Sequence, residues 1–314
     1  MIGHSAGTPE KRFFILRTIV LMLVVLAGPL IFADFSAFST QASGGRQSAV
    51  STNLNILLQM TADYCRKLEN AAFDFVCLEE IKERIDPTLD LSVTSVLPPA
   101  DLAFIKRARS DFLFWGRIKK INNSYVYDYQ CIRSDEEIRE VRRLLEKNGK
   151  KMNVPNAKLE TAIIVYKNVL FGPANVFSEH SQPAYDFRIV GKGKIEGRSV
   201  VIVDATPRAG APETKNLYGR AWIDAKTADI LKIQWSETRI DHYDIFRERG
   251  KRYGRQPRIT LRSEFLVEKN GVRFPSRLFV EEAYINVKGK ASIRSETTVV
   301  YRDFRFFTVE VEIR

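Results

Sequence analysis

The chain has 314 residues, of which 45% are hydrophobic and 28% are charged, a composition that excludes a disordered chain and is typical of globular proteins. This length is sufficient for one large domain or two small ones. The formal net charge of +11 suits a negatively charged partner such as an anionic membrane or a nucleic acid, and it equally fits a soluble protein with a basic surface.

Residues 1–42 have the pattern of a signal peptide with its leader. Basic residues precede an apolar run over residues 19–33, which is shorter than the ~20 apolar residues that a membrane-spanning helix needs. Small residues follow and end at Ala42, where the sequence fits a cleavage site. We therefore predict export to the periplasm or cell envelope, with an uncleaved anchor in the inner membrane as the alternative.

Residues 43–51 are rich in Ser, Gly and Ala and are predicted to form a flexible leader to a single domain over residues 52–314. Apolar residues recur every three or four positions over residues 52–68, which predicts an amphipathic helix. The spacing changes to alternation over residues 73–85, which predicts the first strand.

The sequence contains three cysteines, Cys65, Cys77 and Cys131. An exported protein meets an oxidising compartment, and Cys65 and Cys77 flank the predicted helix-to-strand join, so we predict a Cys65–Cys77 disulfide. Three buried thiols are the alternative. No histidine lies near either cysteine of the pair, so no metal site is predicted.

The middle of the chain mixes both spacings. Residues 135–147 remain open between helix, which the local spacing favours, and strand, which the neighbouring segments favour. Pro173 fits the first turn of a helix that would run to Gln182. The other predicted elements are a helix over residues 100–114 and strands over residues 125–133, 185–190 and 199–205, the last two joined by a turn region at 191–197.

The stretch 217–313 has the clearest pattern, in which apolar and polar residues alternate along several consecutive segments. Asn270-Gly271 separates two of these segments and favours a tight two-residue hairpin. Residues 224–229 are predicted as a turn, and residues 241–257 as the longest loop. Because the apolar residues occupy every second position, they lie on the same face of each strand. We therefore expect a long antiparallel sheet with one apolar, concave face.

No catalytic constellation is found. His180 and His242 have no partner residues at a spacing typical of catalytic or metal sites, and residues 193–199 resemble a phosphate-binding loop only superficially. The pairs Glu79-Glu80 and Glu281-Glu282 lie in predicted strands, where adjacent residues point to opposite faces. We expect them to be solvated charges, or to line a cavity where one points inward. The protein is predicted not to be an enzyme and to need no cofactor.

Basic residues and aromatic residues alternate within residues 239–258. This combination can bind single-stranded nucleic acid, but an exported protein more readily meets an anionic lipid surface. A solvated loop without a partner is the alternative. The basic residues predicted to face the membrane are Arg247, Arg249, Lys251, Arg252 and Arg255.

Two segments resemble a known family. Residues 219–233 contain a strand-turn-strand with the pattern W-I-D-x-x-T, and residues 267–275 contain a hairpin with the pattern N-G-x-x-F-P. Together with the leading helix, they resemble the periplasmic lipoprotein carriers of the LolA/LolB type, and the whole chain also looks like an exported bacterial family of unassigned role. The chain is longer than a typical carrier, and no cysteine follows the apolar run, so the anchored acceptor type does not fit.

The resemblance implies an α+β fold, mostly antiparallel β: a curled, half-open β-barrel of roughly ten strands, with an N-terminal helix and inserted helices capping the concave face. It also implies that the concave face holds acyl chains, with a lipid or an acylated protein as partner. Because an exported protein rarely meets nucleic acid, no nucleic acid is expected as a partner. A structural or protein-interaction scaffold without a small ligand is the rival hypothesis, and a closed core is the alternative to a cavity. The candidate cavity residues, chosen by alternation, are Leu231, Ile233, Trp235, Leu261, Phe265, Phe274 and Leu278.

Overall fold

The computed structural model describes residues 44–92, 119–134, 137–161, 169–209, 217–236 and 243–307. The predicted signal peptide, the predicted helix at 100–114 and the end of the alternating stretch, residues 308–313, lie outside these residues. Among the described residues, no helix has the length and apolar character needed to cross a membrane.

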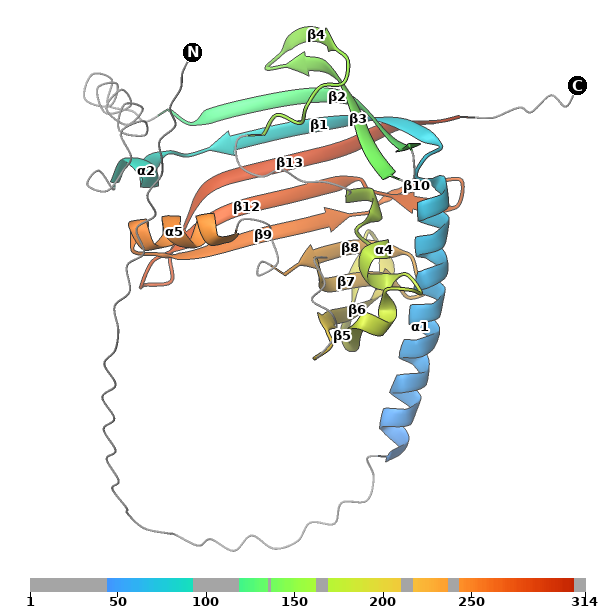
Figure 1. The fold of residues 1–314 in the computed structure, drawn as a ribbon. Coiled ribbons are helices and arrows are strands. Elements are labelled where there is room, and N and C mark those ends of the chain that lie inside the picture. Colours follow the sequence, from blue (N-terminus) through green and yellow to red (C-terminus); the bar gives the residue numbers. More distant parts are fainter. Residues whose placement is uncertain are drawn as a thin grey trace, which may run out of the picture. The chain divides into compact units, whose positions relative to one another are not determined.

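The fold is dominated by one large antiparallel sheet of eleven strands in the described part of the chain (Figure 1). Its spatial order is β4-β3-β2-β1-β13-β12-β9-β8-β7-β6-β5, so β4 and β5 are the two edges and the sheet does not close on itself. This confirms the predicted curled, mostly antiparallel and half-open fold. The strands are β1 (Phe75–Ile85), β2 (Ile121–Ser134), β3 (Glu137–Lys147), β4 (Lys150–Val154), β5 (Tyr185–Ile195), β6 (Arg198–Pro207), β7 (Gly219–Asp224), β8 (Ile230–Trp235), β9 (Gln256–Glu264), β12 (Arg277–Ile285) and β13 (Ala291–Phe306).

Half of the neighbouring strand pairs in the sheet are joined by short hairpins, and the turn residues explain where the chain reverses. Asn148 and Gly149 have φ of 51° and 77°, and Asn270 and Gly271 have φ of 51° and 72°. Positive φ at both central positions matches the twist of a two-residue hairpin. The second pair forms the predicted hairpin, between β10 (Val267–Lys269) and β11 (Val272–Phe274), which make a separate two-stranded sheet.

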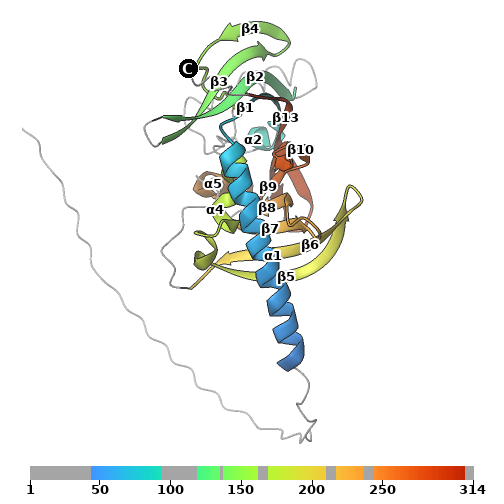
Figure 2. The same cartoon turned by 90° about the vertical axis from the view of Figure 1, so that its right-hand side faces the viewer.

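The long helix α1 (Gly44–Ala71) contains the predicted helix and begins eight residues earlier. The predicted apolar face is correct, because Leu57, Leu58, Thr61, Cys65 and Leu68 are all buried. The helix packs against α4 (Ala174–Phe177), the short 3₁₀ helix η1 (Val169–Phe171) and β11. Figure 2 shows α1 passing in front of the strands at the β5 end of the sheet.

One open choice is resolved and two local predictions need correction. Residues 137–147 form the strand β3, which resolves the open choice in favour of strand. The helix expected from Pro173 to Gln182 ends at Phe177, and a 3₁₀ turn (Gln182–Ala184) follows. The turn expected over 191–197 is only Glu196-Gly197, both with positive φ, because the strands on either side continue to Ile195 and from Arg198.

The predicted long loop at 241–257 is also wrong, because residues Tyr243–Tyr253 form helix α5. Phe246 and Gly250 are its buried residues, one helical turn apart. At Gly250, a Cβ would lie 2.7 Å from the Arg255 carbonyl oxygen, so only glycine lets α5 fold back against the start of β9. Because this helix has few apolar residues among many charged ones, no helical spacing of apolar residues could be recognised in its sequence.

Candidate functional site

The candidate cavity residues all lie in the interior of the protein. All seven are buried, and six of them belong to one contiguous cluster of core side chains. Leu231 is the exception, because it occupies a β-bulge in β8 and lies outside that cluster. Trp235 on β8 pairs with Leu261 on β9, and its indole N–H donates to the Ser263 hydroxyl at 2.9 Å.

A short cap covers this part of the inner face. It consists of η1 and α4, whose buried side chains include Leu170, Val176 and Phe177. The cap approaches the sheet closely at Gly172, where a Cβ would lie only 2.9 Å from Cζ2 of Trp235. A glycine at this position therefore lets the cap rest directly on the indole ring.

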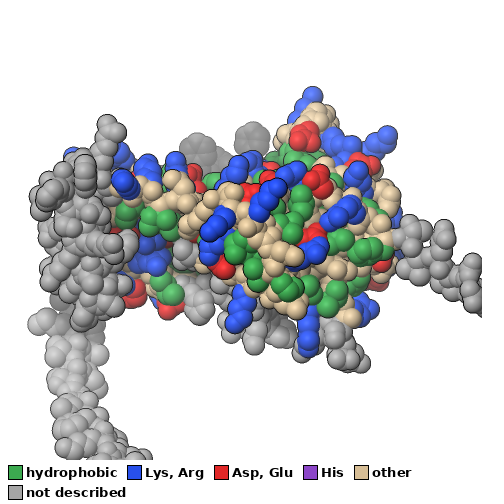
Figure 3. Space-filling model, turned by 90° about the horizontal axis from the view of Figure 1, so that it is seen from above, with side chains coloured by type: hydrophobic (Ala, Val, Ile, Leu, Met, Phe, Trp, Pro, Cys, Tyr) green, Lys and Arg blue, Asp and Glu red, His purple; other side chains and the backbone are tan. Residues whose placement is uncertain are grey.

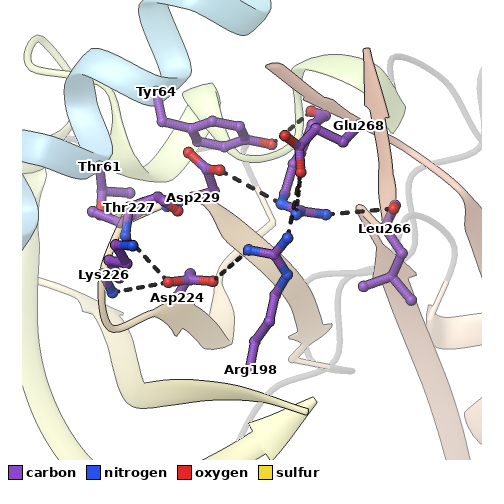
Figure 4. A network of polar contacts seen from close by, with 11 residues as sticks. Thr61, Tyr64, Arg198, Asp224, Lys226, Thr227, Asp229, Leu266 and Glu268 are labelled. Carbon is purple, nitrogen blue, oxygen red and sulfur yellow. Dashed lines mark hydrogen bonds and ion pairs between the residues drawn. The ribbon is translucent and has the colours of Figure 1, made fainter. Parts of the chain in front are cut away.

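Helix α1 is tied to the structures beneath it by hydrogen bonds to backbone carbonyls (Figure 4). The Tyr64 hydroxyl donates to the carbonyl oxygen of Arg273 on β11 at 3.0 Å, and the Thr61 hydroxyl donates to the carbonyl oxygen of Ala228, after β7, at 3.1 Å. In the opposite direction, the Gln182 amide donates to the carbonyl oxygen of Leu58 at 2.9 Å. Because each bond is made to a backbone carbonyl, together they fix the position of the helix relative to β11, the β7–β8 turn and residue Gln182.

An ion cluster lies beneath these contacts and joins the two segments that carried the family resemblance. The guanidinium of Arg273, in the N-G-x-x-F-P hairpin, lies 2.5 Å from Glu268 and 3.5 Å from Asp229, which follows the W-I-D-x-x-T turn. Arg198 on β6 bridges to Asp224 at 3.3 Å and to Glu268 at 3.5 Å (Figure 4). Sequence patterns showed both turns but not that they meet.

The pKa values of the two aspartates of this cluster are shifted in opposite directions. Burial raises the pKa of Asp229. Burial also opposes ionisation of Asp224, but hydrogen bonds from the backbone N–H groups of Lys226 and Thr227 and the nearby Arg198 together lower its pKa. Asp224 is thus held as a carboxylate that closes the β7–β8 turn.

The inner face is not apolar throughout, and the prediction that both acidic pairs are solvated is wrong for one member of each. Glu79 and Glu282 are fully buried and inward-facing, whereas their neighbours Glu80 and Glu281 remain on the outer face. Glu79 is bound by Arg142 on β3. An inward glutamate could have been expected, because Glu79 shares the parity of Phe75, Cys77 and Ile81 along β1.

Glu282 is the centre of a second buried charge cluster. Its carboxylate accepts hydrogen bonds from Arg249 on α5 at 3.1 Å, from Arg294 on β13 at 3.1 Å and from Tyr284 and Ser295 at 2.6 and 3.0 Å. Arg294 also binds Asp90 of α2 (Thr88–Ser92). These two carboxylates raise the pKa of Arg294 despite its burial, so the guanidinium stays charged.

The five basic residues predicted to face a membrane are therefore not one group. Arg249 binds the buried Glu282, and Arg255 donates to the Ser292 hydroxyl at 2.6 Å, so both are engaged with the sheet. Arg247, Lys251 and Arg252 are exposed on the outer side of α5. Elsewhere basic, acidic and apolar side chains are interspersed, as on the face seen in Figure 3.

The predicted Cys65–Cys77 disulfide is not present, and all three cysteines are free and buried. Helix α1 continues for six residues beyond Cys65, about 9 Å of rise, so the helix-to-strand join does not hold Cys65 beside Cys77. Cys77 pairs with Tyr129, so Cys131 is its diagonal neighbour. Diagonal positions lie about 7–8 Å apart, beyond the usual span of a disulfide.

A polar cleft of about 580 Å³ lies between α1 and residues 178–182. His180 lines it, with its Nε2 3.3 Å from the Ser178 hydroxyl oxygen, and that hydroxyl donates to Ser181 at 3.0 Å. His242 lies outside the described residues. Across the part of the chain that the structure describes, no group of three or more His, Cys, Asp or Glu side chains could hold a metal ion.

Comparison with known proteins finds resemblance only among solved structures. No family model and no curated protein matches the chain. A DUF1329 family protein from Desulfovibrio piger is 11% identical with a TM-score of 0.35, covering 79% of this chain and 92% of its own. A LolA superfamily protein from Nitrosomonas europaea is 9% identical with a TM-score of 0.35, covering 80% and 94%.

An outer membrane lipoprotein-sorting protein domain from Vibrio parahaemolyticus is 10% identical, with a TM-score of 0.35 and coverage of 81% of this chain and 94% of its own. These are similarities to solved structures, and they do not assign the chain to a superfamily. With TM-scores below 0.5, they carry no argument about function, which is argued below from the described residues.

Proposed function

We propose that this chain is a non-catalytic protein of the cell envelope that binds a lipid or acyl chain between the inner face of its sheet and the helices that cover it. One observation carries the proposal: the sheet ends at β4 and β5 without closing, so helices rather than strands cover its apolar face. A helical cover can separate from a sheet without breaking strand pairing, which gives a ligand a route inward.

The distribution of charge limits where such a ligand would lie. Buried ion pairs at Glu79 and Glu282 occupy the inner face on the β1, β3 and β13 side. The apolar core continues on both sides of these pairs and includes Trp235, Leu261 and Phe265. Gly172, between η1 and α4, approaches the indole of Trp235, so the cap covers this part of the core. Each buried methylene of an acyl chain would contribute about 0.8 kcal/mol, so even a short chain in this region would bind usefully.

Uptake of a fluorescent fatty acid tests the proposal, together with native mass spectrometry of protein purified from its own envelope. Leu261→Phe keeps the core apolar but fills space, so it should fold and take up less probe. Val190→Asp, on the exposed edge strand β5, is the control and should bind like the parent. A folded parent that shows no displaceable probe and carries no lipid would falsify the proposal.

The same buried charges favour a second candidate, an envelope scaffold that binds another protein and no small ligand. Satisfied ion pairs on the inner face stabilise a fixed sheet rather than an adaptable cavity. This candidate predicts that the protein co-purifies with a protein partner, and that Leu261→Phe changes stability without altering probe uptake, because the parent takes up none.

A further inference from the structure

Helix α5 and the turn between β12 and β13 form one end of the sheet, which we call the α5 end, comprising residues 243–255 and 286–290. The two segments are joined through β9, because Gln256 pairs with Ile285, and through the bond from Arg255 to Ser292. Figure 1 shows α5 and this end of β12 and β13 on the same side of the fold.

The inward side of α5 is fixed to the sheet. Phe246 packs in the core, Arg249 binds Glu282, and Tyr253 hydrogen-bonds to Asp90 while its ring packs edge-on against Tyr284, with centroids 4.7 Å apart. Since these contacts hold one side of the helix, the side chains on its other side are presented in a defined orientation.

The outward side of the α5 end is basic. The exposed charged side chains are five basic ones against two acidic ones, Asp244 and Glu248. Glu248 forms an ion pair with Lys251 at 2.7 Å within the helix. The basic residues are Arg247, Lys251 and Arg252 on α5, and Lys288 and Lys290 on the turn.

The turn also presents an apolar side chain to solvent. Val287 is 98% exposed and lies immediately before Lys288. The turn is held by Asn286, whose side-chain oxygen accepts hydrogen bonds from the N–H groups of Lys288 and Lys290, and by Gly289 with φ of 76°. None of these contacts uses the valine side chain, so turn formation does not explain it.

We propose that the α5 end docks onto an anionic lipid bilayer, with Val287 entering the interface and the five basic side chains meeting phosphate head groups. An apolar tip between cations suits a membrane surface, where aliphatic groups enter and Lys and Arg stay at the head groups. Nucleic acid is disfavoured, because base stacking needs accessible aromatic rings, whereas Phe246 is buried, Tyr243 is half-buried beside it and Tyr253 packs against Tyr284. This docking does not depend on the proposed acyl-chain binding.

Vesicle co-sedimentation tests the docking, with phosphatidylglycerol mixed into phosphatidylcholine and with phosphatidylcholine alone. The variant Lys288→Ser/Lys290→Ser removes two charges from the turn, and Lys192→Ser/Lys194→Ser removes two equally spaced, exposed charges from β5. A basic residue near an anionic surface is worth about fivefold in affinity. We therefore expect about 30-fold weaker binding for the first variant and a much smaller change for the second.

Val287→Ser should weaken binding several-fold without changing its salt dependence, because it removes apolar contact and no charge. Equal losses for the two lysine pairs, or undiminished binding to neutral vesicles, would show general charge attraction or another surface and overturn the proposal. Tight binding of a single-stranded oligonucleotide that is lost in Lys288→Ser/Lys290→Ser would also overturn it. Fatty-acid uptake, measured without vesicles, should be the same in all three variants.

Discussion

Glu79 on β1 and Arg142 on β3 form a two-point ion pair across the intervening strand β2. The guanidinium donates from Nε at 2.6 Å and from Nη2 at 3.1 Å, and the Tyr301 hydroxyl donates to the same carboxylate at 3.1 Å. Both charged side chains are buried, with exposures of 0% and 7%. Burial takes both charges out of water, and the cost of this desolvation is offset only by the attraction between them.

Glu79→Ala should lower the free energy of unfolding by about 3–5 kcal/mol, because it leaves the Arg142 guanidinium buried without its main acceptor. The double variant Glu79→Leu/Arg142→Met should recover most of this loss, since it removes both charges while keeping volume. Urea denaturation of the three proteins measures the effect.

The control is Arg143→Ala, which removes one of the two arginines that pair with Asp128 on the outer face, where the Arg143 side chain is 53% exposed. That change should cost at most about 1 kcal/mol. A Glu79→Ala variant as stable as Arg143→Ala would mean that the inner pair is hydrated and not buried in solution.

Asp224 predicts a dependence of stability on pH. Its pKa is lowered in the folded protein, so ionised Asp224 stabilises the fold above its unfolded pKa of about 3.9, and this contribution disappears as the pH falls through the folded pKa. Asp229, whose pKa is raised, acts in the opposite sense. Asp224→Asn should therefore be less stable than the parent at pH 7, and the difference should shrink below about pH 4. Thermal melts of both proteins across this pH range measure the difference in stability. A difference that does not change with pH would show that ionised Asp224 does not stabilise the fold.

Two buried tyrosines offer a matched comparison for the attachment of α1. Tyr64→Phe removes the hydrogen bond to the Arg273 carbonyl and should cost about 1 kcal/mol, with faster hydrogen exchange in α1. Tyr185→Phe removes a buried hydroxyl that has no hydrogen-bond partner among the described residues, so it should be neutral or stabilising. Equal effects of the two changes would show that the Tyr64 bond does not hold the helix.

The cysteines should remain unreactive thiols in the folded protein. Burial raises the pKa of Cys65 and of Cys77, and that of Cys131 to about 11, so the reactive thiolate form is scarce as well as inaccessible. A thiol reagent should label no cysteine under native conditions and all three in denaturant. Recovery of any disulfide-linked pair of peptides in non-reducing peptide mapping would contradict this prediction.

Alternating apolar residues predicted most of the sheet correctly, because one face of each strand is buried. The pattern failed at β3, where the inward positions include Arg142 beside Leu144, and apolar Val141 and Leu145 lie on the other face. A buried Arg142 is compatible with the fold only because its charge is paired with Glu79 on β1, two strands away. Nothing local in residues 137–147 could reveal that partner.

In the candidate site too, the burial of single residues could be predicted from the sequence but their contacts with distant segments could not. The burial of Trp235, Leu261 and Phe265 was predictable from parity, whereas their contact with the cap through Gly172 depends on segments distant in sequence. The basic segment before β9 was misjudged because only Phe246 and Gly250 of α5 are buried. Its inward arginine, Arg249, has an acceptor 33 residues further along the chain.

The pairing of β1 with β13 has a consequence for how the chain acquires its structure. Strands β1–β4 form one local meander and strands β5–β9 with β12 and β13 another, and the β1–β13 ladder joins them. Tyr301 and Glu79, which meet at this seam, are 222 residues apart in sequence. Contacts of such separation form slowly, because loop closure comes before the gain from pairing. During synthesis, β1 must keep one edge unpaired until β13 has emerged, so this seam is where we expect assembly to be completed and where a chaperone would be most needed.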